Sequence, residues 1–405
     1  MIHPFRGLRY DLAKTGGDQS KLVTQPYDKI SPGLKAEYLA ANPHNVVRLI
    51  RGESGPEDQS WHAAAGKTLR AWIAEDILRP DDQPAYYVYR QHFTLPDGRK
   101  VTRSGVTGIF DLRKKDAVRH HERTHSSARV DRRHLLDHTA AHFGQIFILR
   151  HQGPPFDNAL LDLAQDAVDV TEPDGTRHEF SRLTDPAACA SLQAIYDQSG
   201  FVIADGHHRF TVAGQYADDS SHEGANFAMV TCVDLEDPGL VVLPTHRILH
   251  GLTDDKKSEL AAFIESQSTE SISLDQGSEA FVQAVAQAGA GTIGVVTEKG
   301  ALLWRPDKSA AKSELEKLDA YILDNDVIAP ATKGLNEDQA LTYRRSATAA
   351  VKDVKEKGAD AAFLLNAVPP RDVTDIAEVG GIMPPKSTDF FPKMLTGFVI
   401  YDTKA

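Results

Sequence analysis

The sequence predicts an α+β fold, and three stretches carry this prediction. Residues 61–78 have helical patterning. Residues 86–94 and 100–110 are rich in aromatic and β-branched side chains and flank the turn signal at 95–98, which predicts a β-hairpin. Residues 201–204 form a short apolar run before Asp-Gly, and apolar side chains then recur at helical spacing. This last stretch is a predicted strand, tight turn and helix.

Helices and strands keep alternating along the rest of the chain. We expect strands at 145–149, 227–233, 240–242 and 361–366, helices at 258–266 and 279–288, and a pair of strands at 291–297 and 301–304. A length of 405 residues exceeds one typical core. We therefore predict an N-terminal extension at 1–105, a core domain at 106–250 and a C-terminal α/β domain at 251–405.

Composition and charge exclude several classes of protein. Hydrophobic residues make up 41% of the chain and charged residues 25%, as in ordinary globular proteins. A formal net charge of -12 argues against a general binder of nucleic acids or anionic membranes, although small anionic ligands remain compatible. Only Cys189 and Cys232 occur, so we expect neither a disulfide framework nor a thiolate zinc site. The sequence has no leader-like N-terminus and no 18-residue apolar run, so we expect a cytoplasmic protein.

The most informative polar cluster is Asp205-Gly206-His207-His208-Arg209, which follows the predicted strand at 201–204. The turn at Gly206 places this cluster at the start of the predicted helix. Free backbone N–H groups, the positive end of the helix dipole and Arg209 are suited to holding phosphate there. A carboxylate beside phosphate is unusual, and Asp205 would have to bind a metal ion, accept a proton or orient a histidine. The alternative is an ordinary turn with a solvated polar cap.

A second cluster begins at His121 and Glu122, in a segment from 113 to 133 that is unusually rich in cations. His121, Glu122 and His125 match the H-E-x-x-H pattern of zinc hydrolases, with Asp131 as a conceivable third ligand. The surrounding arginines disfavour zinc. They should instead keep Glu122 ionised, so that it could accept a proton from an acceptor hydroxyl.

A third cluster, Lys386-Ser387-Thr388, follows two prolines. One cation and two hydroxyls after an extended approach are groups that bind phosphate, although a surface loop with a helix cap would also explain them. Lys393 is either an additional cation or a solvated side chain.

In this order the three clusters resemble the motifs of the free serine kinases of the ParB/sulfiredoxin-like superfamily. Those kinases are similar in having a His-Glu pair, a strand that ends in Asp-Gly-His-His-Arg and a late Pro-Lys-Thr-Thr segment. The chain as a whole, including Pro26-Tyr27-Asp28 and Asp131-Arg132, is more similar to a bacterial family catalogued as domain of unknown function number 1015. The kinases are shorter, and Ser387 stands where they have threonine.

The resemblance implies a ParB/sulfiredoxin-like nucleotide-binding core and a small-molecule kinase. It implies that Glu122 and Asp205 are catalytic carboxylates and that His121 and Thr124 bind the substrate. Donor phosphates would be held by Gly206, His207, His208, Arg209, Lys386, Ser387 and Thr388. The expected donor is ATP or ADP with Mg²⁺, and the expected acceptor is free L-serine or a similar hydroxylated metabolite.

Two other functions remain open at this point. A ParB-like core could hold a nucleotide for regulation without transferring phosphate, and the zinc hydrolase is the second alternative. The identity of donor and acceptor, the role of residues 1–105 and the oligomeric state do not follow from the sequence.

Overall fold

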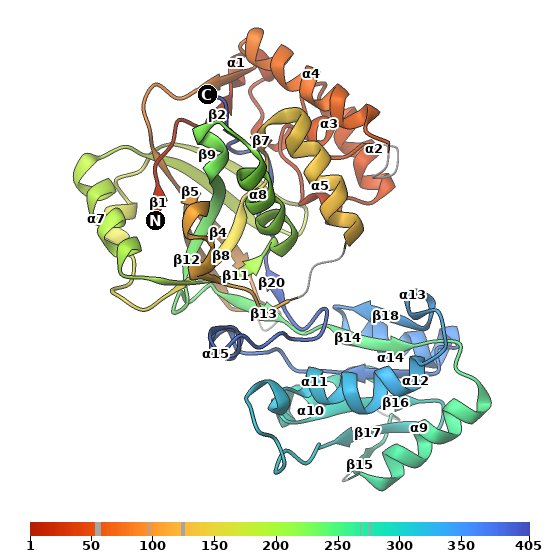
Figure 1. Ribbon diagram of the computed structural model, residues 1–405. Coiled ribbons are helices and arrows are strands. Elements are labelled where there is room, and N and C mark those ends of the chain that lie inside the picture. Colours follow the sequence, from red (N-terminus) through yellow and green to blue (C-terminus); the bar gives the residue numbers. More distant parts are fainter. Residues whose placement is uncertain (53–57, 96–97, 123–125, 268, 275–276) are drawn as a thin grey trace. The chain divides into compact units, whose positions relative to one another are not determined.

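The computed structural model describes residues 1–52, 58–95, 98–122, 126–267, 269–274 and 277–405. The chain divides into two compact units (Figure 1). Unit 1 comprises Met1–His120, Thr124–Leu240 and Pro392–Ala405, and unit 2 comprises His121–Arg123 and Val241–Phe391. Both units mix helices and strands, so the fold is α+β.

These units differ from the predicted division of the chain. The expected boundary at residue 105 falls inside strand β5 (Lys100–Asp111), which is paired along most of its length with β4 (Tyr86–Thr94). A domain boundary there would break the hairpin. The expected boundary at residue 250 lies after β14 (His246–Leu249), which already belongs to unit 2.

Unit 1 is built on a mixed sheet of nine strands within the described residues. In spatial order its strands are β6 (Val118–Arg119), β11 (Gly200–Asp205), β8 (Ile146–His151), β12 (Phe227–Asp234), β5, β4, β10 (Arg177–Leu183) and β9 (Gln165–Thr171), and β1 (Ile2–His3) also pairs with β5. β11 is parallel to β6 and antiparallel to β8. The hairpin β4–β5 and the strand β11 confirm the predictions from the sequence.

The helices of unit 1 pack around this sheet, and several of them come from the N-terminal part of the chain. They are α1 (Leu12–Thr15), α2 (Pro32–Ala41), α3 (Val47–Ile50), α4 (Ser60–Ala74), α5 (Ser126–Thr139), α6 (Asn158–Leu161), α7 (Pro186–Asp197) and α8 (His207–Asp219), with short 3-10 turns η1 (Gln19–Lys21), η2 (Tyr27–Lys29), η3 (Leu112–Ala117) and η4 (Glu223–Asn226). α5 packs against both α4 and α8, as Figure 1 shows. Phe201 and Ile203 of β11 share a buried core with Phe210 of α8. Burial of these apolar side chains fixes where β11 ends and α8 begins.

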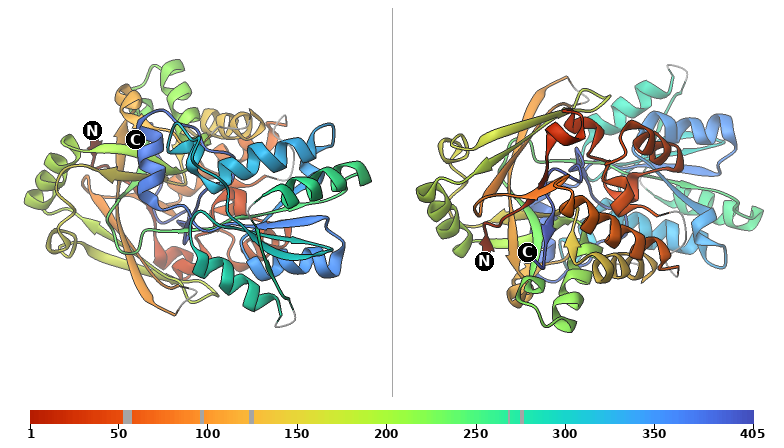
Figure 2. Two further views of the ribbon diagram at one scale, coloured as in Figure 1. Left: turned by 90° about the horizontal axis from the view of Figure 1, so that it is seen from below. Right: turned by 90° about the horizontal axis from the view of Figure 1, so that it is seen from above.

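Both ends of the chain are part of unit 1. β2 (Leu8–Tyr10) pairs with β3 (Leu78–Pro80), and β21 (Tyr401–Asp402) pairs with β7 (Ala141–His142). The backbones of Leu8 and Ile400 exchange hydrogen bonds of 2.9 and 3.0 Å. In Figures 1 and 2 the dark blue C-terminal segment accordingly runs among the red N-terminal elements.

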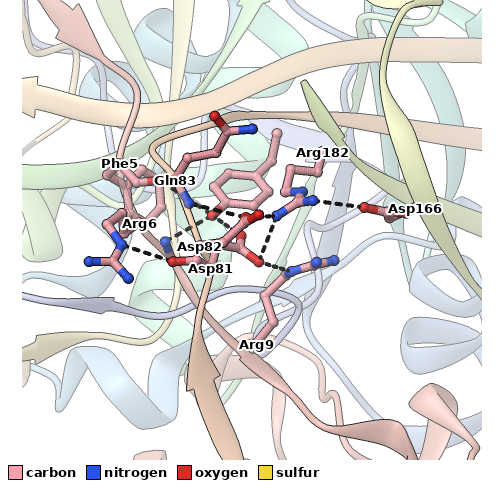
Figure 3. A network of polar contacts seen from close by, with 10 residues as sticks. Phe5, Arg6, Arg9, Asp81, Asp82, Gln83, Asp166 and Arg182 are labelled. Carbon is pink, nitrogen blue, oxygen red and sulfur yellow. Dashed lines mark hydrogen bonds and ion pairs between the residues drawn. The ribbon is translucent and has the colours of Figure 1, made fainter. Parts of the chain in front are cut away.

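A buried carboxylate ties the N-terminal segment to the sheet (Figure 3). Asp81 accepts hydrogen bonds from the Tyr87 hydroxyl at 2.6 Å and from Arg9 Nε at 3.0 Å. Arg182 of β10 contacts Asp81 and also pairs with Asp82 at 2.6 Å. Because breaking such a network would leave a buried charge unpaired, residues before 105 are held to the sheet rather than attached as a loose extension.

Unit 2 contains a second sheet, in which every neighbouring pair of strands is antiparallel. Its order is β15 (Thr269–Ile272), β17 (Gly300–Trp304), β16 (Ile293–Thr297), β19 (Ala361–Leu364), β14 and β18 (Leu341–Arg344). A separate pair joins β13 (Val241–Leu243) to β20 (Asp389–Phe391). The helices are α9 (Asp254–Ser266), α10 (Ser278–Ala288), α11 (Asp319–Leu323), α12 (Ala329–Thr332), α13 (Glu337–Ala340), α14 (Ala347–Lys357) and α15 (Pro370–Glu378), with the 3-10 turn η5 (Leu315–Lys317) and the π-turn η6 (Asp324–Ile328).

Strand β19 lies inside this sheet, and its residues are buried on both faces. Ala361 and Phe363 point into one apolar core, whereas Ala362 and Leu364 point into another on the opposite face. Alternate residues of a strand face opposite sides of a sheet, so a continuous apolar run requires a covered sheet. The predicted strand at 361–366 and the paired strands at 291–297 and 301–304 are confirmed.

Among the described residues, no helix combines the length and the apolar character needed to cross a membrane.

Candidate functional site

The candidate site of unit 1 lies where β11 passes into α8. Asp205 is the last residue of β11, and Gly206 is the N-cap of α8 with a φ of 97°. This left-handed conformation favours glycine, and an added Cβ would lie only 3.0 Å from the Arg209 guanidinium. The glycine has no side chain with which to cap the helix, and the positive end of the α8 dipole lies at this turn.

A cluster of ion pairs stands at this helix start. Asp205 accepts hydrogen bonds from Arg209 Nη2 and from Lys393 Nζ, each at 2.9 Å. Burial by itself would raise the pKa of Asp205, but Lys393 and Arg209 outweigh that effect and hold this pKa well below its usual range. Asp205 is therefore an anion at neutral pH and leaves one net positive charge in the group of three.

The segment 392–396 brings Lys393 to Asp205, and polar groups of the sheet hold this segment by its backbone. Gln91 donates to the Lys393 carbonyl at 3.0 Å, and the Tyr89 hydroxyl accepts the Leu395 N–H at 3.0 Å. Gln145 donates to the Leu395 carbonyl at 3.2 Å. The position of Lys393 is therefore fixed by buried residues of unit 1.

The histidines of the motif differ in environment. His207 is buried, and its ring centroid lies 5.8 Å from that of His120. Burial lowers the pKa of His120, which is thus uncharged at neutral pH. His208 is half-buried. Arg209 and Lys393, which pair with Asp205, provide fixed positive charge at the start of α8.

A separate cluster lies in unit 2, where His121 and Glu122 are adjacent to the segment that contains Lys386, Ser387 and Thr388. Glu122 forms a parallel bridge with Met383, whose N–H donates to the His121 carbonyl at 2.8 Å. His121 Nε2 lies 3.2 Å from the Thr388 hydroxyl. Two clusters that are more than 260 residues apart in the chain are thereby adjacent within one unit.

In this unit 2 cluster, residues 384–388 form a loop with an unusual backbone conformation. Lys386 is exposed and has a φ of 59°, which is uncommon for a residue other than glycine. The buried Ser387 donates to the Pro384 carbonyl at 2.7 Å, and the buried Arg247 donates to the Pro385 carbonyl at 3.3 Å. Backbone strain of this kind persists only where the surroundings enforce it, and it is frequent at binding sites.

The zinc alternative required His121 and Glu122 on a helix, and this expectation is wrong. Both residues precede α5, which begins at Ser126, and they are extended because they pair with Met383. Asp131 lies in unit 1, where it contacts His62 and Arg132. Within the part of the chain that the structure describes, no group of three or more His, Cys, Asp or Glu side chains could hold a metal ion. Thr124 and His125 lie outside the described residues.

The positive charge of the segment 113–133 is offset by carboxylates from elsewhere in unit 1. Arg113 pairs with Asp111 at 2.7 Å, and Lys115 pairs with Asp218 at 2.6 Å. Arg133 pairs with Asp219 at 2.7 Å. At these three positions the excess of cations in the sequence reflects ion pairs with carboxylates of unit 1.

Comparison with solved structures finds distant similarity. A mutant of a free serine kinase in complex with ADP is 12% identical, with a TM-score of 0.40 over 72% of this chain and 92% of that chain. A conserved hypothetical protein from Pyrococcus furiosus is 14% identical, with a TM-score of 0.37 over 70% and 90% of the two chains. C-terminally truncated SbnI from Staphylococcus aureus is 8% identical, with a TM-score of 0.38 over 72% and 87%.

Comparison with families is more decisive. None of the curated proteins matches the chain. Residues 2–321 match the family described as protein of unknown function (DUF1015), which is well over half of the chain. The match includes the β11–α8 motif and the His121-Glu122 pair, and the chain belongs to this family.

Proposed function

We propose that this protein is a small-molecule kinase that transfers a phosphoryl group from a nucleotide to a hydroxyl group, with free L-serine as the first acceptor to test. The observation that carries the proposal is the half-buried set Asp205, Arg209 and Lys393 at the start of α8. It combines a helix N-terminus with two fixed cations, which are the groups that hold and neutralise donor phosphates. The motif resemblance to the free serine kinases supports the same function.

The roles of the side chains follow from the chemistry of phosphoryl transfer. The acceptor oxygen forms a bond to the terminal phosphorus while the bond from that phosphorus to the nucleotide breaks, and the acceptor loses its proton. We assign the proton to Glu122 and the neutralisation of the departing phosphate to Arg209 and Lys393. Asp205 holds both cations and stands beside the transferring group. From the resemblance we also propose that Lys386, Ser387 and Thr388 bind donor phosphates and that His121 binds the acceptor.

A resident Mg²⁺ does not fit the described residues of unit 1. Each carboxylate oxygen of Asp205 already accepts a hydrogen bond from a cation, so a metal ion coordinated by Asp205 would be repelled by two adjacent positive charges. We therefore derive no step through Mg²⁺, which would enter only as the counterion of the nucleotide phosphates. We also propose, from the resemblance, that the core of unit 1 is ParB/sulfiredoxin-like.

The first test is a search for a phosphorylated product. The purified protein is incubated with ATP, ADP, CTP or pyrophosphate and a panel of hydroxylated metabolites that includes L-serine, and the products are analysed by mass spectrometry. We expect phosphoserine. Glu122→Gln should lower turnover by about a hundredfold or more because it removes the general base, while nucleotide affinity is retained. Glu356→Gln, an exposed glutamate of α14, is the matched control and should keep full activity.

One outcome would contradict this function, and another would contradict the role of Glu122. If no pair of donor and acceptor gives a phosphorylated product and nucleotide binding survives Glu122→Gln, the protein is a nucleotide-binding regulator. If product forms equally fast in Glu122→Gln, the protein is a kinase but its base is another group.

A further inference from the structure

Unit 1 contains a pocket that the motifs above do not account for. The space inside it that is open to water-sized groups is about 60 Å³, enough for several of them, and the pocket opens to solvent. Its walls come from several segments that are distant in sequence: the N-terminal residues Pro26, Tyr27 and Ile50, helix α5, residues 141–144, helix α8 and Thr396. The N-terminal part of the chain thus contributes directly to a cavity.

One wall of the pocket is flat and rigid. The Arg132 guanidinium lies over the Tyr27 ring, with its Cζ 4.1 Å from the ring centroid. Arg132 in turn donates to the Ile50 carbonyl at 3.1 Å and to Asp131 at 2.8 Å. Asp131 is further held by His62 at 3.1 Å. An aromatic ring and a planar cation are therefore fixed in place, as a stacking surface requires.

Another wall of the pocket includes the buried residue His142. His142 is 8% exposed, and its Nε2 has no hydrogen-bond partner among the described residues. Burial, reinforced by the nearby Arg209, lowers the pKa of His142 to about 4, so the ring is neutral. His142 is one of the residues that line the pocket, so its neutral ring is a candidate contact for a ligand.

The pocket and the phosphate-binding motif share Arg209. Its side chain lines the pocket, donates to the Gln145 carbonyl through Nη1 and pairs with Asp205 through Nη2. Gly144 leaves the room for this arrangement, because an added Cβ would lie 3.2 Å from Arg209 Nη1 and 3.1 Å from Thr396 Oγ1. A ligand with its phosphates at α8 can therefore continue into the pocket past Arg209.

We propose that this pocket receives the heteroaromatic base of the nucleotide, with the base stacked on Tyr27 and its polar edge hydrogen-bonded to His142. The described residues that line the pocket include two guanidinium groups and no carboxylate, so the ammonium group of an amino acid would have no counterpart there. Apolar walls, one stacking surface and one neutral polar contact match a planar, uncharged ring. That the ligand is a nucleotide rests on the proposed function. In this inference Pro26 and Tyr27 form one wall of the base site.

The test compares nucleotides with the same phosphates that lack a base. ATP, CTP, GTP, UTP and tripolyphosphate are titrated calorimetrically into the wild type, Tyr27→Ala, Tyr27→Phe and His142→Phe. Tyr27→Ala should weaken the best nucleotide about tenfold or more through lost stacking and leave tripolyphosphate affinity unchanged. Tyr27→Phe keeps the ring and should bind as the wild type does. His142→Phe should reduce the discrimination between bases about fivefold. Tyr321→Ala, in unit 2, is the matched control, and thermal unfolding verifies that each variant is folded.

The outcomes separate this inference from the kinase function. Unchanged nucleotide affinity in Tyr27→Ala, an equal loss for tripolyphosphate, or a wild type that binds tripolyphosphate as tightly as any nucleotide would each overturn the base pocket. The phosphorylated product alone then decides the kinase function. Conversely, a selective loss of nucleotide binding in Tyr27→Ala together with no phosphoryl transfer by the wild type supports the pocket and overturns the kinase.

Discussion

At the scale of single residues, the environment of a side chain decides its charge in unit 1. Asp205 is largely buried yet ionised, since two cations contact its oxygens. His142 is buried without an anionic partner and is neutral. The same dehydration therefore gives opposite results, because only one of these groups has counter-charges within hydrogen-bond distance. A charged cluster suited to phosphate and a neutral histidine suited to a base can thus both lie next to Arg209.

The lowered pKa of His142 predicts how stability depends on pH. Its pKa is about 4 in the folded protein and near 6.5 when unfolded, so its contribution is complete above about pH 6.5 and is lost as pH falls toward 4. Between pH 7 and pH 5 the free energy of unfolding should fall by about 2 kcal/mol through this group. Urea denaturation at both pH values measures the change, and His142→Phe should show a correspondingly smaller fall. An identical fall in the variant would mean that folding does not lower the pKa of His142.

At the scale of elements, the segment 392–396 determines the electrostatics of the α8 start. It carries Lys393 to Asp205, and Gln91, Tyr89 and Gln145 hold its backbone. A cation that these buried groups keep beside a helix N-terminus needs no reorganisation when a phosphate binds. After residue 391 the chain re-enters unit 1, and Lys393 then completes the cluster of charges at the start of α8.

Lys393→Met tests this role because it removes the charge and keeps the length of the side chain. We expect weaker binding of pyrophosphate by about tenfold and a loss of about 1–2 kcal/mol of stability at pH 7, since Asp205 keeps only Arg209. The pKa of Asp205 is lowered by folding, so the stability difference is complete above about pH 4 and fades as the carboxylate is protonated in more acidic solution. Calorimetry and urea denaturation at pH 7 and pH 3 are the measurements. Lys352→Met, an exposed lysine of α14, is the control. Unaltered affinity for pyrophosphate in Lys393→Met would show that this lysine only supports the fold.

Elements were predictable from the sequence where local pattern determines them. The apolar run of β11, the glycine at 206 and the helical spacing after Phe210 define strand, turn and helix without reference to the rest of the chain. Lys393 could not be assigned in this way, because its partner Asp205 is 188 residues away and the contact depends on how the chain returns. The pocket wall of Tyr27 and Arg132 depends on contacts of the same kind. Only a family resemblance marked these residues in the sequence.

At the scale of the whole molecule, the two units differ in how the chain builds them. Among the described residues, the apolar cores on the two faces of the unit 2 sheet are formed by residues between 248 and 365. Unit 2 therefore supplies its own core. Unit 1 is discontinuous and needs its C-terminal segment, which pairs β21 with β7 and Thr396 with Thr24. A self-contained core is the main requirement for independent folding.

This difference predicts separate responses to two truncations. A fragment of residues 241–391 should fold and unfold cooperatively, because it retains both cores and the complete six-stranded sheet of the described residues. Deleting residues 392–405 from the full chain should instead destabilise unit 1 by several kcal/mol, because the deletion removes the Ile400 and Phe398 side chains from buried positions as well as Lys393. Calorimetry and hydrogen exchange on the fragment, the deletion variant and the full chain are the measurements. Exchange in β16 and β19 should stay slow in all three proteins, whereas exchange in β7 and β8 should become fast in the deletion variant. A fragment that shows no cooperative transition would mean that unit 2 depends on the rest of the chain for its stability.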